Sequence, residues 1–174
     1  AATYQKMVEL GYYPWWTDPA LKIAFWRPIS ALTHWLDYRL WPGSPWLMHV
    51  QNIVWLLLVC WLAWWLYRSL FQQRWVAGVA LVLYVLNDAF SVPVTWLANR
   101  NALVLLFFSL LCLYCHHRWR EGEGSKGVYA WSAWAAFALG LLSGEGAIAV
   151  TAYLFAYALF LEHRAKGWVQ RLGT

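Results

Sequence analysis

The sequence predicts an all-α protein, a multi-spanning transmembrane helical bundle with an N-terminal interfacial helix. Of its 174 residues, 62% are hydrophobic and only 12% are charged, whereas average soluble domains carry about 25% charged residues. Its sixteen tryptophans and ten tyrosines have the rings that favour the membrane–water interface. Several apolar runs approach the length of a membrane span. A soluble domain is therefore excluded, and because nothing resembles a nucleic-acid-binding module, we expect no nucleic-acid partner.

Residues 1–45 are the first predicted region, an outer-face segment at the membrane interface. Trp15, Trp16, Phe25 and Trp26 would anchor it at the level of the lipid headgroups. The segment has neither an initiator Met nor the basic start and apolar core of a signal peptide. We therefore expect this chain to be part of a longer one or a processed product.

A short amphipathic helix over residues 28–41 is predicted within this region. Pro28 suits the first turn of a helix, and four apolar residues then recur at helical spacing: Ile29, Leu32, Leu36 and Leu40. The opposite face carries a polar stripe made of Arg27, Ser30, His34 and Asp37. This stripe either lines a cavity or is a solvated face of a helix in the interface plane.

Residues 46–163 are the second region, a transmembrane bundle of about five spans. The clearest span is 46–67, which is uncharged and has His49 and Asn52 on one helical face. These two side chains either continue the polar stripe or bond to neighbouring helices. The other runs are 75–86 (extended to 90), 95–115, 128–142 and 147–161. The last two are shorter than the roughly 20 residues of a full span, so they borrow flanking residues or lie where the bilayer is thin.

The segment 87–101 is predicted to be a structured loop beside a polar cavity. It places Asp88 and Arg100 near the ends of two spans, where a charge is costly unless it is paired, hydrated or used. Pro93 is expected to break any helix that runs through the loop. An ordinary interhelical turn with interfacial charges is the alternative.

The distribution of basic residues predicts the orientation of the bundle. Alternate loops and the basic tail 164–174 carry eight basic residues: Arg68, Arg74, Arg118, Arg120, Lys126, Arg164, Lys166 and Arg171. The positive-inside rule places these in the cytoplasm. The N-terminal segment, Asp88, Arg100 and Glu145 then converge on the outer face, which predicts a functional site there.

Two local patterns in the sequence bear on cofactor chemistry. The run Cys112-Leu113-Tyr114-Cys115-His116 matches the pattern for covalent haem attachment, but it lies in an apolar run at the predicted cytoplasmic end. A zinc site from Cys112, Cys115, His116 and His117 would be crowded at one helix end. We therefore expect no cofactor, with a divalent metal left open.

Glu145 lies between two glycines at the tip of a helical hairpin. It is either a solvated acid in a turn or a carboxylate aimed at a substrate or a metal beside the membrane. The chain has no phosphate-binding loop, nucleophile elbow or HExxH motif, so the templates of soluble enzymes do not apply.

Five short motifs, in this order, resemble those of GT-C type membrane glycosyltransferases. They are Phe25-Trp26-Arg27-Pro28-Ile29-Ser30, Leu36-Asp37-Tyr38, His49-Val50-Gln51-Asn52, Trp96-Leu97-Ala98-Asn99-Arg100-Asn101 and Leu142-Ser143-Gly144-Glu145. The chain is most similar to the polyprenyl- or dolichyl-phosphate-sugar dependent enzymes, which include protein O-mannosyltransferases. The resemblance runs from about residue 25 to residue 145, with the same topology.

This resemblance implies a tryptophan-rich transferase of the bacterial inner membrane, with residues 1–45 on the periplasmic face. It would pass a sugar from a polyprenyl-phosphate carrier to an acceptor on the outer face. The leaving phosphate needs positive charge, and the acceptor hydroxyl must lose a proton. The resemblance implies catalytic roles for Asp37 and Glu145, and substrate-binding roles for Arg27, His34, Asn99 and Arg100. The expected partners are the bilayer, a lipid-linked sugar and other membrane subunits.

The chain also departs from the family pattern. The family's first span and the acidic loop after it are absent, and Asp18 is the nearest remaining acid. Gly144 stands where the family often has Lys. We therefore expect a fragment of a transferase or a reduced relative without catalysis. The alternative function is a non-catalytic structural subunit packed into a larger membrane protein complex.

Overall fold

The computed structural model of the chain describes residues 6, 8–11, 16, 25–122 and 126–161. No strand occurs among them, which confirms the all-α fold. The elements are α2 (Pro28–Leu40), α3 (Pro45–Leu70), α4 (Arg74–Val85), η1 (Asp88–Phe90), α5 (Ser91–Thr95), η2 (Leu97–Asn99), α6 (Arg100–Glu121), α7 (Lys126–Ser143), η3 (Glu145–Ala149) and α8 (Val150–Phe160). The predictions for Trp15, Asp18 and the tail 164–174 concern residues outside the described ranges.

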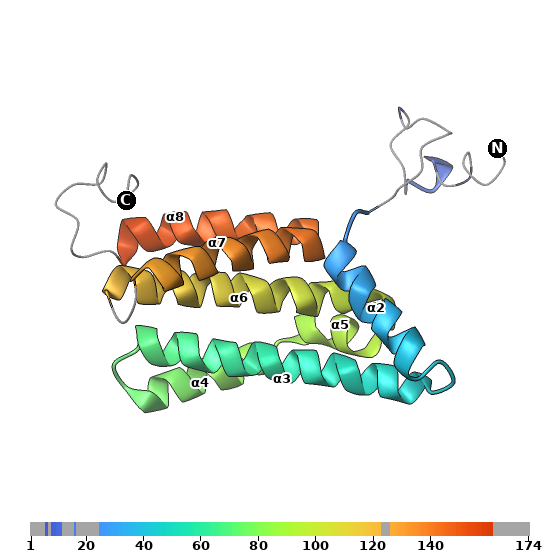
Figure 1. The fold of residues 1–174 in the computed structure, drawn as a ribbon, viewed down its shortest axis with the longest axis horizontal. Helices are drawn as coiled ribbons and strands as arrows, with labels where there is room; N and C mark the ends of the chain where they lie inside the picture. Colours follow the sequence, from blue (N-terminus) through green and yellow to red (C-terminus); the bar gives the residue numbers. More distant parts are fainter. Residues whose placement is uncertain (1–5, 7, 12–15, 17–24, 123–125, 162–174) are drawn as a thin grey trace.

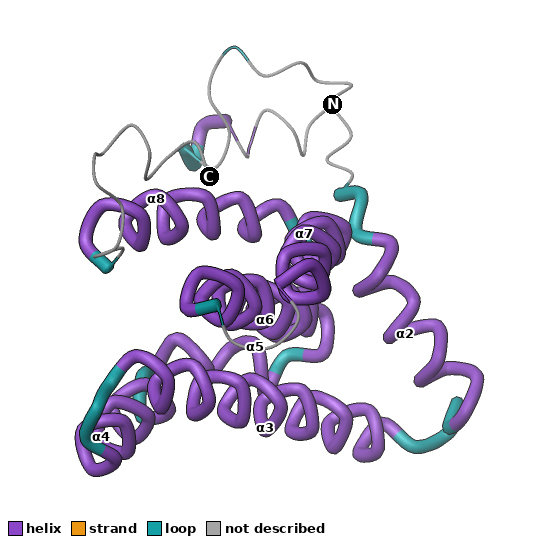
Figure 2. Tube along the Cα trace, turned by 60° about the vertical axis from the view of Figure 1, so that its left-hand side comes forward, coloured by secondary structure: helices purple, strands orange, loops and turns teal. Residues whose placement is uncertain are grey.

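The helices α3, α6, α7 and α8 run along the long axis of the molecule, and α4 folds back beside α3 (Figure 1). At one end of the bundle lie α2, α5, the start of α6 and the turn between α7 and α8 (Figure 1). Figure 2 shows α2 running along the outside, from the end of α7 towards the start of α3. We call this the α2 end of the bundle.

Among the described residues, two helices are long and apolar enough to cross a membrane, Pro45–Leu70 and Leu97–Glu121. With its 26 residues, α3 is about 39 Å long at 1.5 Å per residue, which exceeds the roughly 30 Å of the hydrocarbon core. A bent pair, Arg74–Val85 with Asp88–Thr95, passes the same test as one broken span. The apolar helices Gly127–Ser143 and Glu145–Phe160 are shorter, so the total of about five spans stays a prediction.

The contact between α3 and α6 forms the main apolar core. On α3 it uses Val59, Leu62, Ala63 and Leu66, whose spacing places them in one helical stripe. Leu110 of α6 completes the cluster. Other apolar side chains of α3, such as Trp61 and Trp65, are exposed, as expected of a helix surrounded by lipid.

Small residues allow α7 to approach α6 closely, as is common between helices in membranes. Ala133, Ala136 and Gly140 are buried at helical spacing on α7. A Cβ atom at Gly140 would lie 3.2 Å from the Cβ of Ala147 and 3.6 Å from the Cβ of Phe108. Gly140 therefore lets α6, α7 and η3 meet.

The segment 87–101 is helical in short pieces rather than a loop. The chain bends by 53° between α4 and the η1–α5 unit, and the side chain of Asn87 caps η1 by accepting from the backbone N–H of Ala89. Pro93 is buried in the first turn of α5, where the missing N–H of proline is tolerated. The prediction that Pro93 breaks any helix that runs through this segment was therefore wrong, because α5 contains it.

Helix α2 turns its polar stripe towards the bundle and its apolar face outward. Ser30 and Asp37 are buried, whereas Leu32, Trp35 and Leu36 are exposed. Polar groups gain partners inside a membrane bundle, while apolar groups are stable in lipid. The alternative of a solvated polar face was therefore wrong for Ser30 and Asp37.

Candidate functional site

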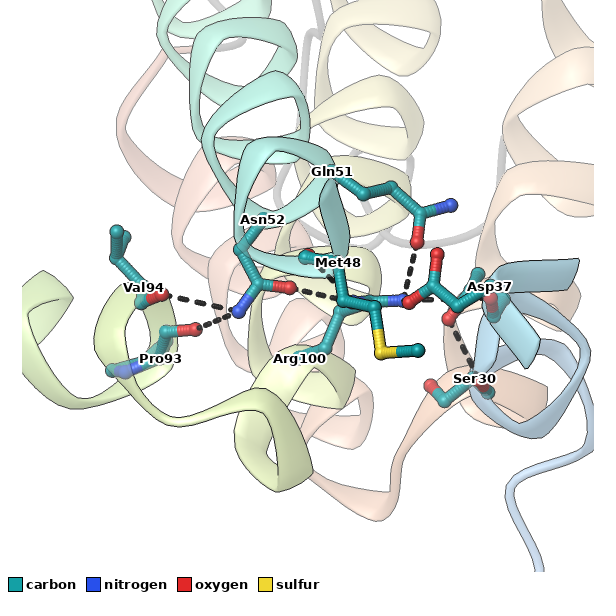
Figure 3. A network of polar contacts seen from close by, with 9 residues as sticks. Ser30, Asp37, Met48, Gln51, Asn52, Pro93, Val94 and Arg100 are labelled. Carbon is teal, nitrogen blue, oxygen red and sulfur yellow. Dashed lines mark hydrogen bonds and ion pairs between the residues drawn. The ribbon is translucent and has the colours of Figure 1, made fainter. Parts of the chain in front are cut away.

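The centre of the α2 end is a buried ion pair between α6 and α2. The Nη1 atom of Arg100 lies 2.5 Å from Oδ2 of Asp37, and the two side chains are 0% and 1% exposed (Figure 3). The Oδ1 atom of Asp37 has no hydrogen-bond partner within the described ranges. A buried charge is tolerated only when it is paired, so each residue of this pair requires the other.

Helix α3 supplies further acceptors to the same guanidinium. Nε of Arg100 donates to Oδ1 of Asn52 at 2.5 Å, and Nη2 donates to the carbonyl of Met48 at 2.9 Å. Nη1 also donates to the side-chain oxygen of Gln51. In Figure 3 the guanidinium lies between Asn52 on one side and Asp37 and Gln51 on the other.

Asn52 extends this network to α5. Its amide nitrogen lies 3.1 Å from the carbonyl oxygen of Val94 and 3.4 Å from that of Pro93. Carbonyls in the last turn of a helix have no partner within that helix, and Asn52 provides one for this short helix. Arg100 and Asn52 therefore hold α2, α3, α5 and α6 together.

A second, exposed ion pair lies at the same end. Nε and Nη2 of Arg27 donate to the two carboxylate oxygens of Glu145, at 3.0 and 2.5 Å. The side chain of Arg27 is 24% exposed and that of Glu145 is 64% exposed. The guanidinium also stacks over the ring of Phe25, 4.3 Å from its centroid. The hydrogen bonds from Arg27 hold the pKa of Glu145 below its usual value.

Between the two ion pairs, a buried hydrogen bond joins α2 to the end of α7. The hydroxyl of Ser30 donates to the carbonyl of Ser143 at 2.7 Å. The next residue, Gly144, is close-packed, because a Cβ atom there would lie 2.8 Å from Cδ2 of Leu105. The hairpin tip that carries Glu145 is thus fixed against both α2 and α6.

The structure joins four of the six predicted site residues in two ion pairs. Arg27 and Glu145 form the exposed pair, and Asp37 and Arg100 form the buried pair. His34 is half-buried on α2; burial lowers its pKa, and the charge of Arg100 lowers it further.

Asn99 is half-buried in η2, directly before Arg100. Sequence reasoning missed the role of Gln51, a polar residue near the start of an apolar span that contacts Arg100. For Asn52, the interpretation as a residue that bonds to neighbouring helices was correct.

An apolar cavity of about 780 Å³ opens between α3, α4, α6 and α8. One end is lined by Gly146, which follows Glu145, and the opposite end by Leu70 and Leu161. The cavity therefore extends along the bundle from Gly146, near the turn between α7 and α8, towards the far end.

At the far end, the cysteine and histidine cluster of α6 is packed into the helix core. Cys112 and Cys115 are buried against Ala133 and Val150. His117 contacts the hydroxyl of Tyr157 at 2.7 Å through Nδ1. In the part of the chain that the structure describes, no three His, Cys, Asp or Glu side chains lie close enough to hold a metal ion.

Comparison with known proteins gives one family. The sequence model of the dolichyl-phosphate-mannose-protein mannosyltransferase family matches residues 27–173. No curated protein and no solved structure gives a significant match. The matched residues include both ion pairs and every described helix from α3 to α8. The chain belongs to the dolichyl-phosphate-mannose-protein mannosyltransferase family, whose members are membrane glycosyltransferases of the GT-C type.

Proposed function

We propose that this chain transfers a sugar from a polyprenyl-phosphate carrier to an acceptor hydroxyl at the α2 end of the bundle. The observation that carries the proposal is the pair of Arg27 and Glu145, a partly exposed cation held against an exposed carboxylate at the α2 end, where Gly146, the residue after Glu145, lines one end of an apolar cavity. Family membership supplies the reaction class. The charges of Arg27 and Glu145 indicate which residues take part in it.

Arg27 is suited to bind the carrier phosphate. Its guanidinium presents two parallel donors to Glu145, which is the geometry that also matches two phosphate oxygens. In the transfer, the acceptor oxygen attacks the anomeric carbon and the bond from that carbon to the phosphate oxygen breaks. The electron pair stays on the phosphate, where Arg27 stabilises the added negative charge.

Glu145 is suited to remove the proton from the acceptor hydroxyl. It is the exposed carboxylate next to Arg27, and a carboxylate in hydrogen-bond reach can act as a general base. Asp37 was also predicted to be catalytic, but its carboxylate is buried against Arg100. Its burial favours a positioning role, in which Asp37 and Arg100 hold α2 beside the bundle. We retain His34 and Asn99 as candidate contacts to the substrate.

The apolar cavity fits the hydrocarbon tail of the carrier. Its lining is mainly apolar, with Ser109 and four tyrosines among the lining residues. A lipid whose phosphate lies at Arg27 would pass its tail by Gly146 into the bundle. Apolar cavities with a few polar groups at one end are typical of ligand sites.

We also propose that the α2 end faces the periplasm of a bacterial inner membrane. The helix ends opposite to it carry Arg68, Arg118 and Arg120, and basic residues gather on the cytoplasmic side. The acceptor would then be an extracytoplasmic molecule.

The test is donor consumption by the chain in proteoliposomes that contain radiolabelled dolichyl-phosphate-mannose or polyprenyl-phosphate-glucose. Arg27→Gln and Glu145→Gln should each lower the rate by about 100-fold or more, because each removes a charge that the transition state requires. Arg39→Gln changes an exposed arginine at the other end of α2 and should stay within about twofold of the wild type. No consumption of any donor by the wild type, or equal rates in all variants, would overturn the proposal.

The alternative function, a non-catalytic subunit, is supported by the exposed aromatic side chains of α7. Trp131 and Trp134 are 76% and 70% exposed, and such side chains can contact lipid or another membrane protein. Purification in mild detergent distinguishes the two functions. A stoichiometric complex with larger membrane chains and no donor consumption would favour the subunit.

A further inference from the structure

We propose that Glu145 is an internal competitor for Arg27, which the phosphate of the donor displaces, so that Glu145 becomes free only after the donor has bound. This inference rests on the proposed function and adds an order of binding to it, with the donor first and the acceptor second. It follows from the way the two ion pairs of the α2 end differ in exposure and in partners.

In the exposed pair, Arg27 can exchange the carboxylate of Glu145 for a phosphate. Arg27 uses Nε and Nη2 to hold both oxygens of Glu145, and these same two atoms would hold a phosphate. A bidentate contact to a carboxylate and a bidentate contact to a phosphate are mutually exclusive on the same donors. Because the side chain of Glu145 is 64% exposed, its carboxylate can return to water when it is displaced, and it does not become a buried unpaired charge.

The buried contacts keep α2 in place during the exchange. Ser30 still donates to the carbonyl of Ser143, and Asp37 still pairs with Arg100. These contacts lie deeper than Arg27 and do not depend on it. Loss of the contact between Arg27 and Glu145 therefore frees two side chains and leaves the helix docked.

The exchange changes what Glu145 can do. While it is held by Arg27, the hydrogen bonds keep its pKa below the usual value, so it is a weak base. Once the phosphate occupies Arg27, Glu145 loses these bonds and lies near a negative charge, and both effects favour its protonated form. It then accepts the proton of the acceptor hydroxyl more readily, with the donor already in place.

The test is equilibrium binding of farnesyl phosphate, a short polyprenyl phosphate, to the detergent-solubilised chain. Glu145→Gln removes the competing charge and keeps the side-chain shape, so its Kd should fall by about three- to tenfold. Arg27→Gln should raise the Kd by about tenfold or more, and Arg27→Gln/Glu145→Gln should match Arg27→Gln alone. Asp88→Asn is the control, because it removes another exposed acid that belongs to neither ion pair; its Kd should stay within about twofold.

The variants separate the inference from the proposed function. If Arg27→Gln loses binding but Glu145→Gln binds no more tightly than the wild type, the competitor role is refuted and the phosphate site stands. An equal gain in Asp88→Asn, or a gain from Glu145→Gln that persists without Arg27, would also refute it. If the wild type and Arg27→Gln bind equally, the phosphate site itself is refuted and the inference falls with it.

Discussion

The buried pair of Asp37 and Arg100 gives a prediction that can be worked from the contacts. Asp37→Asn keeps the shape of the side chain but removes the negative charge, and Arg100 is then left as a fully buried cation. Breaking a buried ion pair by removing one partner costs about 3–5 kcal/mol. The remaining acceptors on Arg100 are neutral, namely the side chains of Asn52 and Gln51 and the carbonyls of Met48 and Thr33. We therefore expect Asp37→Asn to lower the free energy of unfolding by a value in this range.

A second substitution, on α3, can restore a negative charge next to Arg100. Oδ1 of Asn52 lies 2.5 Å from Nε of Arg100, so Asn52→Asp would place a carboxylate against the same guanidinium. That change removes the two amide contacts to Pro93 and Val94, at about 1 kcal/mol each. The double variant Asp37→Asn/Asn52→Asp should therefore recover about 1–3 kcal/mol relative to Asp37→Asn.

The double variant also distinguishes the contribution of Asp37 to stability from its role in positioning α2. In the double variant the carboxylate that pairs with Arg100 belongs to α3. Helix α2 therefore loses its ion pair with Arg100, while the buried charge of Arg100 still has a negative partner. Unfolding is measured by tryptophan fluorescence during titration with a denaturing detergent. Helix docking is measured by maleimide labelling of Thr33→Cys, whose position is buried, with exposed Ala31→Cys as the control. The reasoning is refuted if the double variant is no more stable than Asp37→Asn, or if Thr33→Cys stays protected in it.

Two further predictions concern polar groups outside these pairs. Burial and the charge of Arg100 lower the pKa of His34, so below about pH 6.5 the unfolded chain binds more protons than the folded chain, and stability should fall as the pH is lowered. His34→Gln should make thermal unfolding between about pH 7.5 and 5.5 less dependent on pH, and an unchanged dependence would contradict this. Tyr157→Phe removes the hydroxyl that contacts His117 and should cost about 1 kcal/mol. Exposed Tyr153→Phe should have almost no effect, and equal losses in the two variants would argue against that contact.

Much of the fold was predictable because membrane helices need long apolar runs. The span predicted over 46–67 lies within α3, and the run 95–115 corresponds to η2 and most of α6. The end of α4 was also predictable, since the apolar run 75–86 stops directly before Asn87, but the short helices that follow it were not predicted. Pro93 is the obvious helix breaker in the sequence, but it lies in a first turn, where proline is tolerated.

The candidate site was only partly predictable. The polar stripe on the first helix correctly brought Arg27, Ser30, His34 and Asp37 to one face, since helical spacing is a local property. Which of them is exposed depends on contacts with residues more than sixty positions away, such as Arg100 and Glu145. The sequence could therefore identify the four residues of the two ion pairs, but it could not show which residue pairs with which.

Reversing the exposed pair tests most directly whether Arg27 and Glu145 perform chemistry. The double variant Arg27→Glu/Glu145→Arg restores an ion pair between α2 and the hairpin tip, and both side chains are exposed enough to accept the exchange. We predict normal stability but no consumption of dolichyl-phosphate-mannose in proteoliposomes, because the phosphate ligand and the base have changed places. Recovery of donor consumption in the double variant, with both single reversals inactive, would show that the pair is only a tether and would contradict the account.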